Sequence, residues 1–539
     1  MNRRNFLKSG SIAGASVAAI SLTGCQVKID KEPKDKAAEL ADNFELNELT
    51  IDDLQLQMQK NEHNARGLAE HYIQRIKEID QSGPTLRSII ELNPDALTIA
   101  DQMDAERKAG KIRGPLHGIP VVIKDNIDTA DKMQTTAGSL AMEGNIASKD
   151  AFIVKKLREA GAVIIGKTNL SEWANFRSSK SCSGWSSRGG QTKNPYLLDH
   201  NPCGSSAGSG VAVAANLCAV AIGTETDGSV TCPASVNGVV GIKPTIGLVS
   251  RSGIIPISST QDTAGPLART VKDCAVLLGV ITGIDPDDEI TKTSEGKAQI
   301  DYTKFLDPNG LKGKRIGIEK KPQSENTSID AVFKKAVDVL KQQGAEIIEI
   351  EYFEKIGALG EQENEILKHE FKYGLNKYLQ SSNAKVKSLK EVIEFNKKNE
   401  EKTMPYFKQD TLESSEMRGD LSSRPYLEGL KKSHEGSRKL LDDLINKNKL
   451  DAIAGITMGP ACSTDMWYGD RWGDVYAPMA PAIAGYPHIS VPCGTVYALP
   501  VGLSFFSSAY TEPALIAMAY AFEQATKSRI KPEFKVSIP

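Results

Sequence analysis

Residues 217–235, LCAVAIGTETDGSVTCPAS, place a short apolar run directly before a turn in which Gly228 precedes Ser229. The run from Leu217 to Gly223 has the length and composition of a buried strand. A strand that ends in a Gly-Ser turn presents a hydroxyl for chemistry at the edge of a sheet. A serine hydroxyl is a weak nucleophile, however, and needs a neighbouring base. No histidine or lysine lies within a dozen residues of Ser229, so the base must come from elsewhere in the chain.

A second serine-bearing segment, NPCGSSAGSGVAVAAN, occupies residues 201–216. Its small residues predict a helix whose first N–H groups are free. It lacks the Gly-Lys-Ser/Thr of a phosphate-binding loop. The G-x-S-x-G spacing around Ser206 fits the nucleophile elbow of α/β-hydrolases, an esterase interpretation that requires a later histidine, namely His369, His434 or His488. The other interpretation makes Ser205 a hydroxyl relay to Ser229.

A lysine at the end of a strand is the candidate base. Residues 113–128, RGPLHGIPVVIKDNID, contain an apolar strand that ends at Lys124. A lysine in water has a pKa of about 10.4 and cannot accept a proton at neutral pH. Burial disfavours its charged form and can lower the pKa by several units. Considered alone, Lys124 would be expected to pair with Asp125 or Asp128, so its catalytic assignment depends on the other motifs.

Helical and strand patterns alternate along most of the chain. Further strands are expected at residues 162–168, 314–319, 345–352, 451–456, 488–494 and 501–507, and helices at 151–160, 328–343 and 512–526. This alternation predicts an α/β fold, in which a large, twisted, mixed or largely parallel β-sheet is covered by helices on both faces.

Two segments depart from that alternation. Residues 353–447 are rich in lysine and glutamate with helical spacing, and predict a helical insertion in a single domain that spans residues 47–539. The insertion either shapes a binding site or is a solvated flank without a role. Residues 26–46 are charged and polar, and predict a flexible tether.

The N-terminal residues 1–25, MNRRNFLKSGSIAGASVAAISLTGC, predict a targeting segment. The pair Arg3-Arg4 and its context resemble a bacterial twin-arginine export signal. The last four residues resemble a lipobox, which would make Cys25 the lipidated first residue of the mature chain. We therefore expect an exported lipoprotein that faces the periplasm or the cell exterior and touches the membrane through its lipid alone. A plain secretory peptide is the alternative.

The composition sets further bounds. Of 539 residues, 25% are charged and 40% hydrophobic, which is ordinary for a globular enzyme. The formal net charge of −2 gives no reason to expect a nucleic-acid partner. Eight cysteines are present, and seven remain without Cys25. Their spacing implies neither a disulfide framework nor a metal site, and whether any two of them pair is left open.

Taken in order, GIPVVIKDNID, GSSAGSG and GTETDGSVTCPAS resemble the amidase signature family of serine amidohydrolases. Stretches at residues 238–250, 261–278 and 500–526 extend the resemblance over nearly all of the mature chain except 353–447. The resemblance implies the α/β/α fold of that family and the hydrolysis of carboxylic amides. It also implies a small amide or peptide amide as substrate and no metal or organic cofactor. We expect a monomer.

The resemblance also implies the role of each site residue. Ser229 would be the nucleophile, Ser205 the bridging serine after a cis peptide bond from Gly204, and Lys124 the base. Neutral Lys124 would draw the proton of Ser229 through Ser205 as Ser229 attacks the amide carbonyl. The oxyanion would be held by the backbone N–H groups of Thr226, Asp227, Gly228 and Ser229. Two side chains would support the site: Ser206 through hydrogen bonds to its loop, and Glu225 as a buried carboxylate that orients the turn.

The chain departs from the usual family pattern, Gly-Thr-Asp-Thr-Gly-Gly-Ser followed by arginine. Glu225 replaces the aspartate, Asp227 a glycine and Thr231 the arginine, while Cys203 replaces a glycine before the serine pair. If the glycine usual at 227 has a positive φ, aspartate tolerates that conformation better than most residues.

These departures resemble the bacterial peptide amidase branch, as do GKTNLSEWANFRS at 166–178 and SGWSSRGGQTKNPY at 183–196. That branch removes the C-terminal amide of peptides and releases ammonia. The alternatives are a broad small-molecule or aryl-acyl amidase, a glutamyl-tRNA amidotransferase A-type subunit, and an anchored binding protein without turnover.

Overall fold

The computed structural model describes residues 43–537. The predicted leader, residues 1–25, lies outside the described residues, and so does the predicted tether except for residues 43–46.

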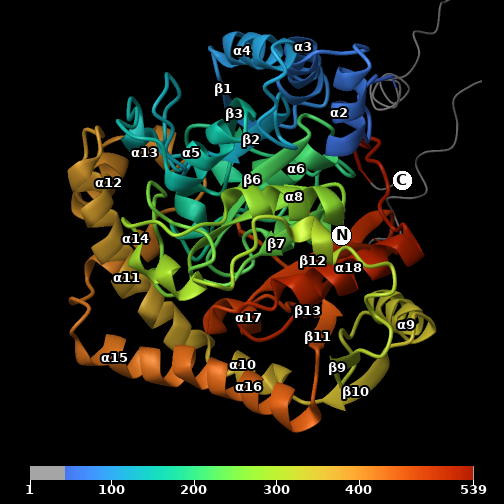
Figure 1. Ribbon diagram of the computed structural model, residues 1–539. Coiled ribbons are helices and arrows are strands. Elements are labelled where there is room, and N and C mark those ends of the chain that lie inside the picture. The colour runs from blue at the N-terminus through green and yellow to red at the C-terminus, as the bar shows by residue number, and fades with distance from the viewer. Residues whose placement is uncertain (1–42, 538–539) are drawn as a thin grey trace, which may run out of the picture.

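A single sheet of eleven strands forms the centre of the molecule, in the order β1-β3-β2-β6-β8-β7-β12-β13-β11-β9-β10 (Figure 1). In that order the strands are Ile89–Leu92, Val163–Thr168, Pro120–Lys124, Val220–Glu225, Thr263–Ala268, Val240–Lys243, His488–Val496, Leu499–Phe506, Ala452–Ile456, Arg315–Glu319 and Glu346–Ile350. The predicted α/β fold with a mixed sheet is confirmed.

The sequence allowed either a mixed or a largely parallel sheet, and the second of these expectations is wrong. Parallel pairing is confined to β2 with its neighbours β3 and β6, and to β9 with its neighbours β10 and β11. The other adjacent strands are antiparallel. The physical reason is clearest at β12 and β13, which are joined by the two residues Tyr497 and Ala498, with φ of 51° and 66°. Such a tight turn joins only antiparallel strands.

Helices cover both faces of the sheet. Helix α7 (Thr231–Val236) packs against the face toward which Gly502 of β13 points, because a Cβ at Gly502 would contact Ser235. Helix α18 (Glu512–Thr526) packs against the opposite face, where Phe505 of β13 and Phe522 lie with ring centroids 6.2 Å apart. Successive residues of a strand point to opposite faces. Gly502 and Phe505 are three residues apart, so α7 and α18 lie on different sides of the sheet.

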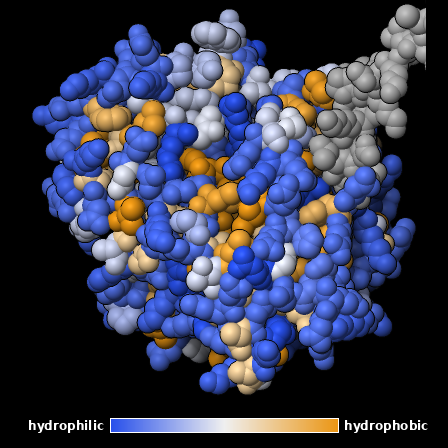
Figure 2. All heavy atoms as spheres, turned by 90° about the horizontal axis from the view of Figure 1, so that it is seen from above, coloured by the Kyte–Doolittle hydropathy of each residue, from blue (hydrophilic) through white to orange (hydrophobic). Residues whose placement is uncertain are grey.

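The other helices outside the insertion are α2 (Ile51–Gln59), α3 (Ala65–Arg75), α4 (Ala96–Lys108), α5 (Phe152–Glu159), α6 (Ala207–Ala214), α8 (Val271–Ile281), α9 (Thr327–Gln342) and α17 (Met479–Ala484). No helix within residues 43–537 is both long and apolar enough to cross a membrane. One face of the molecule is mainly hydrophilic, with hydrophobic side chains gathered near its centre (Figure 2).

The segment predicted as an insertion is helical and borders the left and lower edges of Figure 1. Its helices are α10 (Phe353–Gly357), α11 (Gly360–Ser381), α12 (Leu389–Lys398), α13 (Glu400–Thr403), α14 (Asp410–Glu416), α15 (Arg424–Leu430) and α16 (Gly436–Asn448). A separate hydrophobic cluster joins it to the body of the protein, because Phe371 and Leu375 of α11 pack with Trp173, Ile255 and Ile257.

The order and direction of the strands place the candidate site residues at one edge of the sheet. Lys124 is the last residue of β2 and Glu225 the last residue of β6, and the two strands are parallel neighbours. Both strands therefore end at the same edge of the sheet, where α/β proteins place their ligand sites.

Candidate active site

Lys124 is completely buried, and the nitrogen of its side chain faces hydroxyl groups. Its Nζ lies 2.7 Å from Ser205 Oγ, 3.1 Å from Ser206 Oγ and 2.8 Å from Thr224 Oγ1. Burial lowers the pKa of Lys124 to about 7, against the opposing influence of the carboxylates of Asp262 and Glu225. A neutral amine, able to accept a proton, is thus accessible near physiological pH.

The alternative pairing of Lys124 with a strand-end aspartate is wrong. Asp125 accepts hydrogen bonds from Thr136 Oγ1 and from the N–H of Gly138, and Asp128 accepts one from the hydroxyl of Tyr378 at 2.7 Å. These carboxylates are therefore occupied by other partners.

The segment that carries Ser205 has the expected cis peptide bond, between Gly204 and Ser205. A Cβ at Gly204 would overlap the hydroxyl of Ser171, so only glycine fits at this position. The carbonyl of Ser205 accepts a hydrogen bond from the N–H of Ser171 (3.1 Å), and the N–H of Ser206 donates to the carbonyl of Ser229 (3.1 Å). The last contact places the two serine-bearing segments side by side.

The turn that carries Ser229 depends on Gly228, which has a φ of +73°. The positive φ lies at Gly228, not at Asp227 as the family pattern suggested. A Cβ at Gly228 would overlap the phenol of Tyr476, whose hydroxyl donates to the carbonyl of Asp227 at 2.9 Å. Ser229 is 8% exposed, and its hydroxyl makes no hydrogen bond within residues 43–537. The link from Ser229 to Ser205 is therefore not closed in this structure.

Four successive backbone N–H groups of the same turn have no partner among the described residues, namely those of Thr226, Asp227, Gly228 and Ser229. The next two, of Val230 and Thr231, donate to Glu225 Oε2 at 2.8 and 2.9 Å, and Thr231 Oγ1 donates to the same oxygen at 3.1 Å. Glu225 thus holds the turn as expected, and Thr231 replaces the usual arginine as its partner. The four free N–H groups are suited to an oxyanion.

Ser206 supports the loop and does not form an elbow nucleophile. It is completely buried, and its Oγ donates to the carbonyl of Thr224 (3.0 Å) and accepts from the N–H of Thr224 (3.1 Å). The histidines that the esterase interpretation needs are bonded elsewhere: His369 to the carbonyl of Glu365, His434 to that of Ile483, and His488 to Ser504 Oγ. No catalytic pair with Ser206 results.

The turn that carries Ser229 opens onto a pocket of about 460 Å³. Its lining includes Cys203, Asp227, Ser229, Met458, Trp472, Tyr476 and, from α11, Leu367. A neighbouring pocket of about 320 Å³ shares Ala174, Thr226 and Ile257 with it, and α11 also lines that pocket with Glu370, Tyr373, Gly374, Lys377 and Tyr378. The insertion therefore borders the site through α11 and is not only a solvated flank.

A pair of carboxyl groups connects α11 to the turn, and sequence reasoning missed it. Asp227 opens partly onto the pocket and interacts with Glu363 of α11. Burial and the nearby carboxylates of Glu363 and Glu225 raise the pKa of Asp227, and burial raises that of Glu363. Gln261 donates to Glu363 (2.8 Å) and Tyr476 to Asp227 (3.1 Å). No local motif signals this pair, because its partners are far apart in the sequence.

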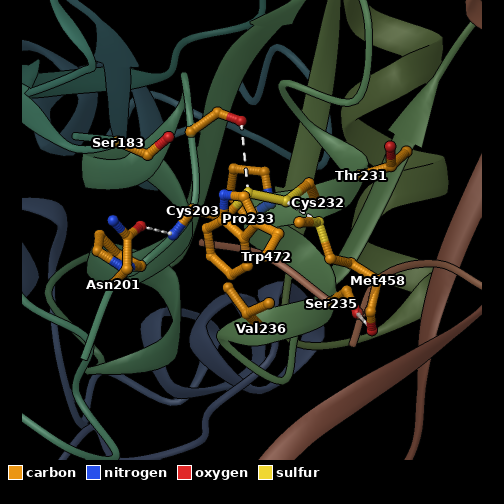
Figure 3. Close-up of a disulfide and its surroundings, with 12 residues drawn as sticks. Ser183, Asn201, Cys203, Thr231, Cys232, Pro233, Ser235, Val236, Met458 and Trp472 are labelled. Carbon is orange, nitrogen blue, oxygen red and sulfur yellow. Dashed lines mark hydrogen bonds between the residues drawn. A yellow bond between two sulfur atoms is a disulfide. The ribbon is translucent and has the colours of Figure 1, made fainter. Parts of the chain in front are cut away.

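A disulfide also borders the site. Cys203 and Cys232 are bonded, with Cα atoms 6.1 Å apart (Figure 3). The sequence left the pairing open, since an odd number of cysteines without paired spacing indicates no partners. The free cysteines in the described part of the chain are Cys182, Cys218, Cys274, Cys462 and Cys493.

Comparisons with known proteins agree with this geometry. A family model described as Amidase matches residues 68–516. A probable amidase of Arabidopsis thaliana is 43% identical over 505 residues, which cover 92% of this chain and 93% of that protein. The A-type subunit of the glutamyl-tRNA(Gln) amidotransferase of Thermoanaerobacter pseudethanolicus is 35% identical, with coverage of 91% and 99%. The structure of the native peptide amidase of Stenotrophomonas maltophilia is 47% identical with a TM-score of 0.86, and covers 91% of this chain and 99% of that one.

The first prediction concerns pH. Covalent labelling of Ser229 by phenylmethylsulfonyl fluoride should speed up as pH rises, with a midpoint near 7, because Lys124 accepts a proton only when neutral. Below the midpoint, the labelling rate should fall about tenfold per pH unit. The measurement is the rate of labelling between pH 5 and 9, followed by mass spectrometry. Glu363→Gln is the control, since the pKa of Glu363 is also raised. A midpoint that disappears in this variant would assign the titration to the carboxyl pair.

The second prediction concerns the turn. Gly228→Ala should lower the free energy of unfolding by about 1–3 kcal/mol, because alanine resists a positive φ and its Cβ meets Tyr476. It should also slow the labelling of Ser229. Gly357→Ala is the matched control, since nothing lies within 4 Å of its added Cβ. Denaturant unfolding measures both variants, and equal stabilities would contradict the role given to Gly228.

Proposed function

The chain belongs to the amidase signature family of hydrolases that act on carbon–nitrogen bonds, and we propose that it removes the C-terminal amide of peptides and releases ammonia. The contact of 2.7 Å between buried Lys124 and Ser205, beside the turn that carries Ser229, is the observation that carries the proposal. The peptide-amide substrate is supported by the 47% identity to a peptide amidase and by the Asp227-containing turn.

In the proposed first step, Ser229 is the nucleophile. Its free hydroxyl turns toward Ser205 when the substrate binds, and its proton passes through Ser205 to neutral Lys124. Ser229 Oγ bonds to the amide carbon, and the carbonyl oxygen becomes an oxyanion. The unpaired N–H groups of residues 226–229 stabilise that charge, and they require little reorganisation because Glu225 and Gly228 already fix the turn.

In the second step, the carbon–nitrogen bond breaks. The proton held by Lys124 returns through Ser205 to the leaving nitrogen, so that ammonia departs and the acyl group remains on Ser229. A water molecule then gives a proton to the relay and its oxygen bonds to the acyl carbon. The bond from that carbon to Ser229 Oγ breaks as the relay returns the proton to Ser229. The products are the original serine and a carboxylic acid, which loses its proton to solvent as the free carboxylate. Lys124 is neutral at the start and end of each half-reaction, which fits a site where its neighbours are hydroxyls.

A second candidate function is the hydrolysis of small aryl or aliphatic amides. It is favoured by part of the pocket lining, in which Met458, Trp472 and Leu367 provide apolar surface. An amidotransferase role is favoured only by the 35% identity to the A-type subunit of such an enzyme. It is less well supported, because Asp227 and Thr231 replace residues usual in the broad family pattern.

We also propose that the protein is exported and held at a membrane by a lipid on Cys25. The support lies in residues 1–25, with their arginine pair and lipobox-like end. These residues lie outside the described part of the chain.

The third prediction tests the activity. The domain that begins after Cys25 should release ammonia from a C-terminally amidated peptide, and mass spectrometry should find only a free terminal carboxylate. Ser229→Ala and Lys124→Ala should each lower kcat by at least about 10³-fold, since they remove the nucleophile and the base. Ser206→Ala should cost far less.

Three outcomes of that assay separate the candidates. Turnover of aryl amides without turnover of peptide amides would move the function to the second candidate. Loss of activity in Ser206→Ala but not in Ser229→Ala would refute the assigned nucleophile. Absence of turnover on any amide, together with unlabelled Ser229, would leave a binding protein.

The fourth prediction tests the anchor. When the full chain is expressed in a bacterial host with radiolabelled palmitate, it should carry the label and sediment with membranes. Cys25→Ser should lose both properties, and Cys462→Ser, a half-buried cysteine of the folded domain, should keep them. Label retained in Cys25→Ser would contradict lipidation at this residue.

A further inference from the structure

The disulfide occupies a position between the two segments that carry the proposed relay. Cys203 lies two residues before Ser205, and Cys232 lies in the first turn of α7, three residues after Ser229. It is the one disulfide within residues 43–537. The covalent bond therefore joins the loop of the proposed bridging serine to the helix that follows the proposed nucleophile.

The backbone N–H groups of the two cysteines are bonded within the segments that carry the serines. The N–H of Cys232 donates to the carbonyl of Gly228 at 2.7 Å, so Cys232 is bonded to the residue that precedes Ser229. The N–H of Cys203 donates to Asn201 Oδ1 at 2.8 Å, and Cys203 has a φ of +57°. Movement of Cys232 would thus act on the backbone next to Ser229, and Cys203 is separated from Ser205 by Gly204 alone.

The disulfide is buried in the wall of the pocket. Cys203 and Cys232 are 4% and 1% exposed, and both line the pocket onto which Ser229 opens. Met458 lies beside Cys232, with its sulfur 2.9 Å from Sγ (Figure 3). The contact with Met458 limits the directions in which Cys232 can move.

Hydrogen bonds also join the two segments. The N–H of Ser206 donates to the carbonyl of Ser229, and Asn237 Nδ2 donates to the carbonyl of Pro202 at 2.8 Å. Ser206 Oγ donates to the carbonyl of Thr224 and accepts from its N–H, at the end of the strand that leads to Ser229. A proton relay through two hydroxyls needs heavy-atom distances of about 2.6–3.2 Å, and a displacement of 1 Å can cost about 10²-fold in rate. A covalent bond next to both serines would therefore help to keep the distance between their hydroxyls within this range.

We propose that the Cys203–Cys232 disulfide is a positioning element for the serine relay, which holds Ser205 and Ser229 in reach of each other. This inference rests on the proposed amide hydrolysis. The disulfide takes no part in the chemical steps. Its opening into two thiols would leave the fold intact and increase the separation of the two hydroxyls.

The test compares the protein with and without the bond. Tris(2-carboxyethyl)phosphine reduces the disulfide to two thiols while the phosphine is oxidised to its oxide with oxygen from water. Mass spectrometry after alkylation then identifies which cysteines were opened. The variant C203A/C232A lacks the bond permanently, and C462A/C493A, which removes two half-buried free cysteines, is the matched control.

We expect a split between the kinetic parameters. In reduced wild type and in C203A/C232A, kcat for the amidated peptide should fall about tenfold or more, with KM within a factor of two. The rate of Ser229 labelling should fall in parallel. Reoxidation should restore the wild type but not C203A/C232A, and C462A/C493A should match the wild type throughout. A role in stability alone would not change kcat in a protein that remains folded.

Four outcomes would overturn the inference. The first is free thiols at Cys203 and Cys232 in the untreated protein, and the second is unchanged kcat and unchanged labelling of Ser229 after reduction. The third is a loss of activity that coincides with global unfolding, measured by near-ultraviolet circular dichroism. The fourth is an equal loss of activity in C462A/C493A. If C203A/C232A does not fold, reduced wild type carries the test.

Failure of the proposed function gives a different result. The untreated wild type would then turn over no amide, while the labelling of Ser229 would still report whether reduction disturbs the serine pair.

Discussion

The buried amine of Lys124 is the constraint on which the site depends. Within residues 43–537 it has no carboxylate in ion-pair contact, and its neighbours are the hydroxyls of Ser205, Ser206 and Thr224 and the carbonyl of Thr224. A charged lysine would be costly in such surroundings, whereas a neutral one is satisfied by hydroxyl groups. Two segments distant from Lys124 in the sequence supply them, residues 205–206 and Thr224, and the parallel pairing of β2 with β6 places Thr224 beside Lys124.

Close approach of these segments requires residues without side chains. A Cβ at Gly223 of β6 would overlap Ser206, and one at Gly208 of α6 would overlap the carbonyls of Ser88 and Asn169. At Gly204, Gly223 and Gly228 the missing Cβ leaves room for the side chains of Ser171, Ser206 and Tyr476, and at Gly208 it leaves room for backbone. The glycines of the motifs thus lie where segments of the chain are in close contact.

The sequence predicts the parts of the site that local patterns encode. Strands that end at Lys124 and Glu225 follow from apolar runs, and the family resemblance indicates the serines and the cis bond. What it missed depends on long-range contacts. Neither the Asp227–Glu363 pair nor the Cys203–Cys232 bond has a local signal. The antiparallel course of β12 and β13 was hidden because their turn uses Tyr497 and Ala498, not the Asn-Gly pair that usually marks such turns.

The placement of α11 divides the molecule into two parts that can vary separately. The sheet and its edge hold every group of the proposed relay, while the insertion supplies a wall through Leu367 and a carboxyl through Glu363. Substitutions on the pocket side of α11 can therefore reshape what the enzyme accepts without moving the lysine or the serines. Related chains could diversify in substrate range by exchanging this wall, provided that whichever helix replaces it still offers a partner for Asp227.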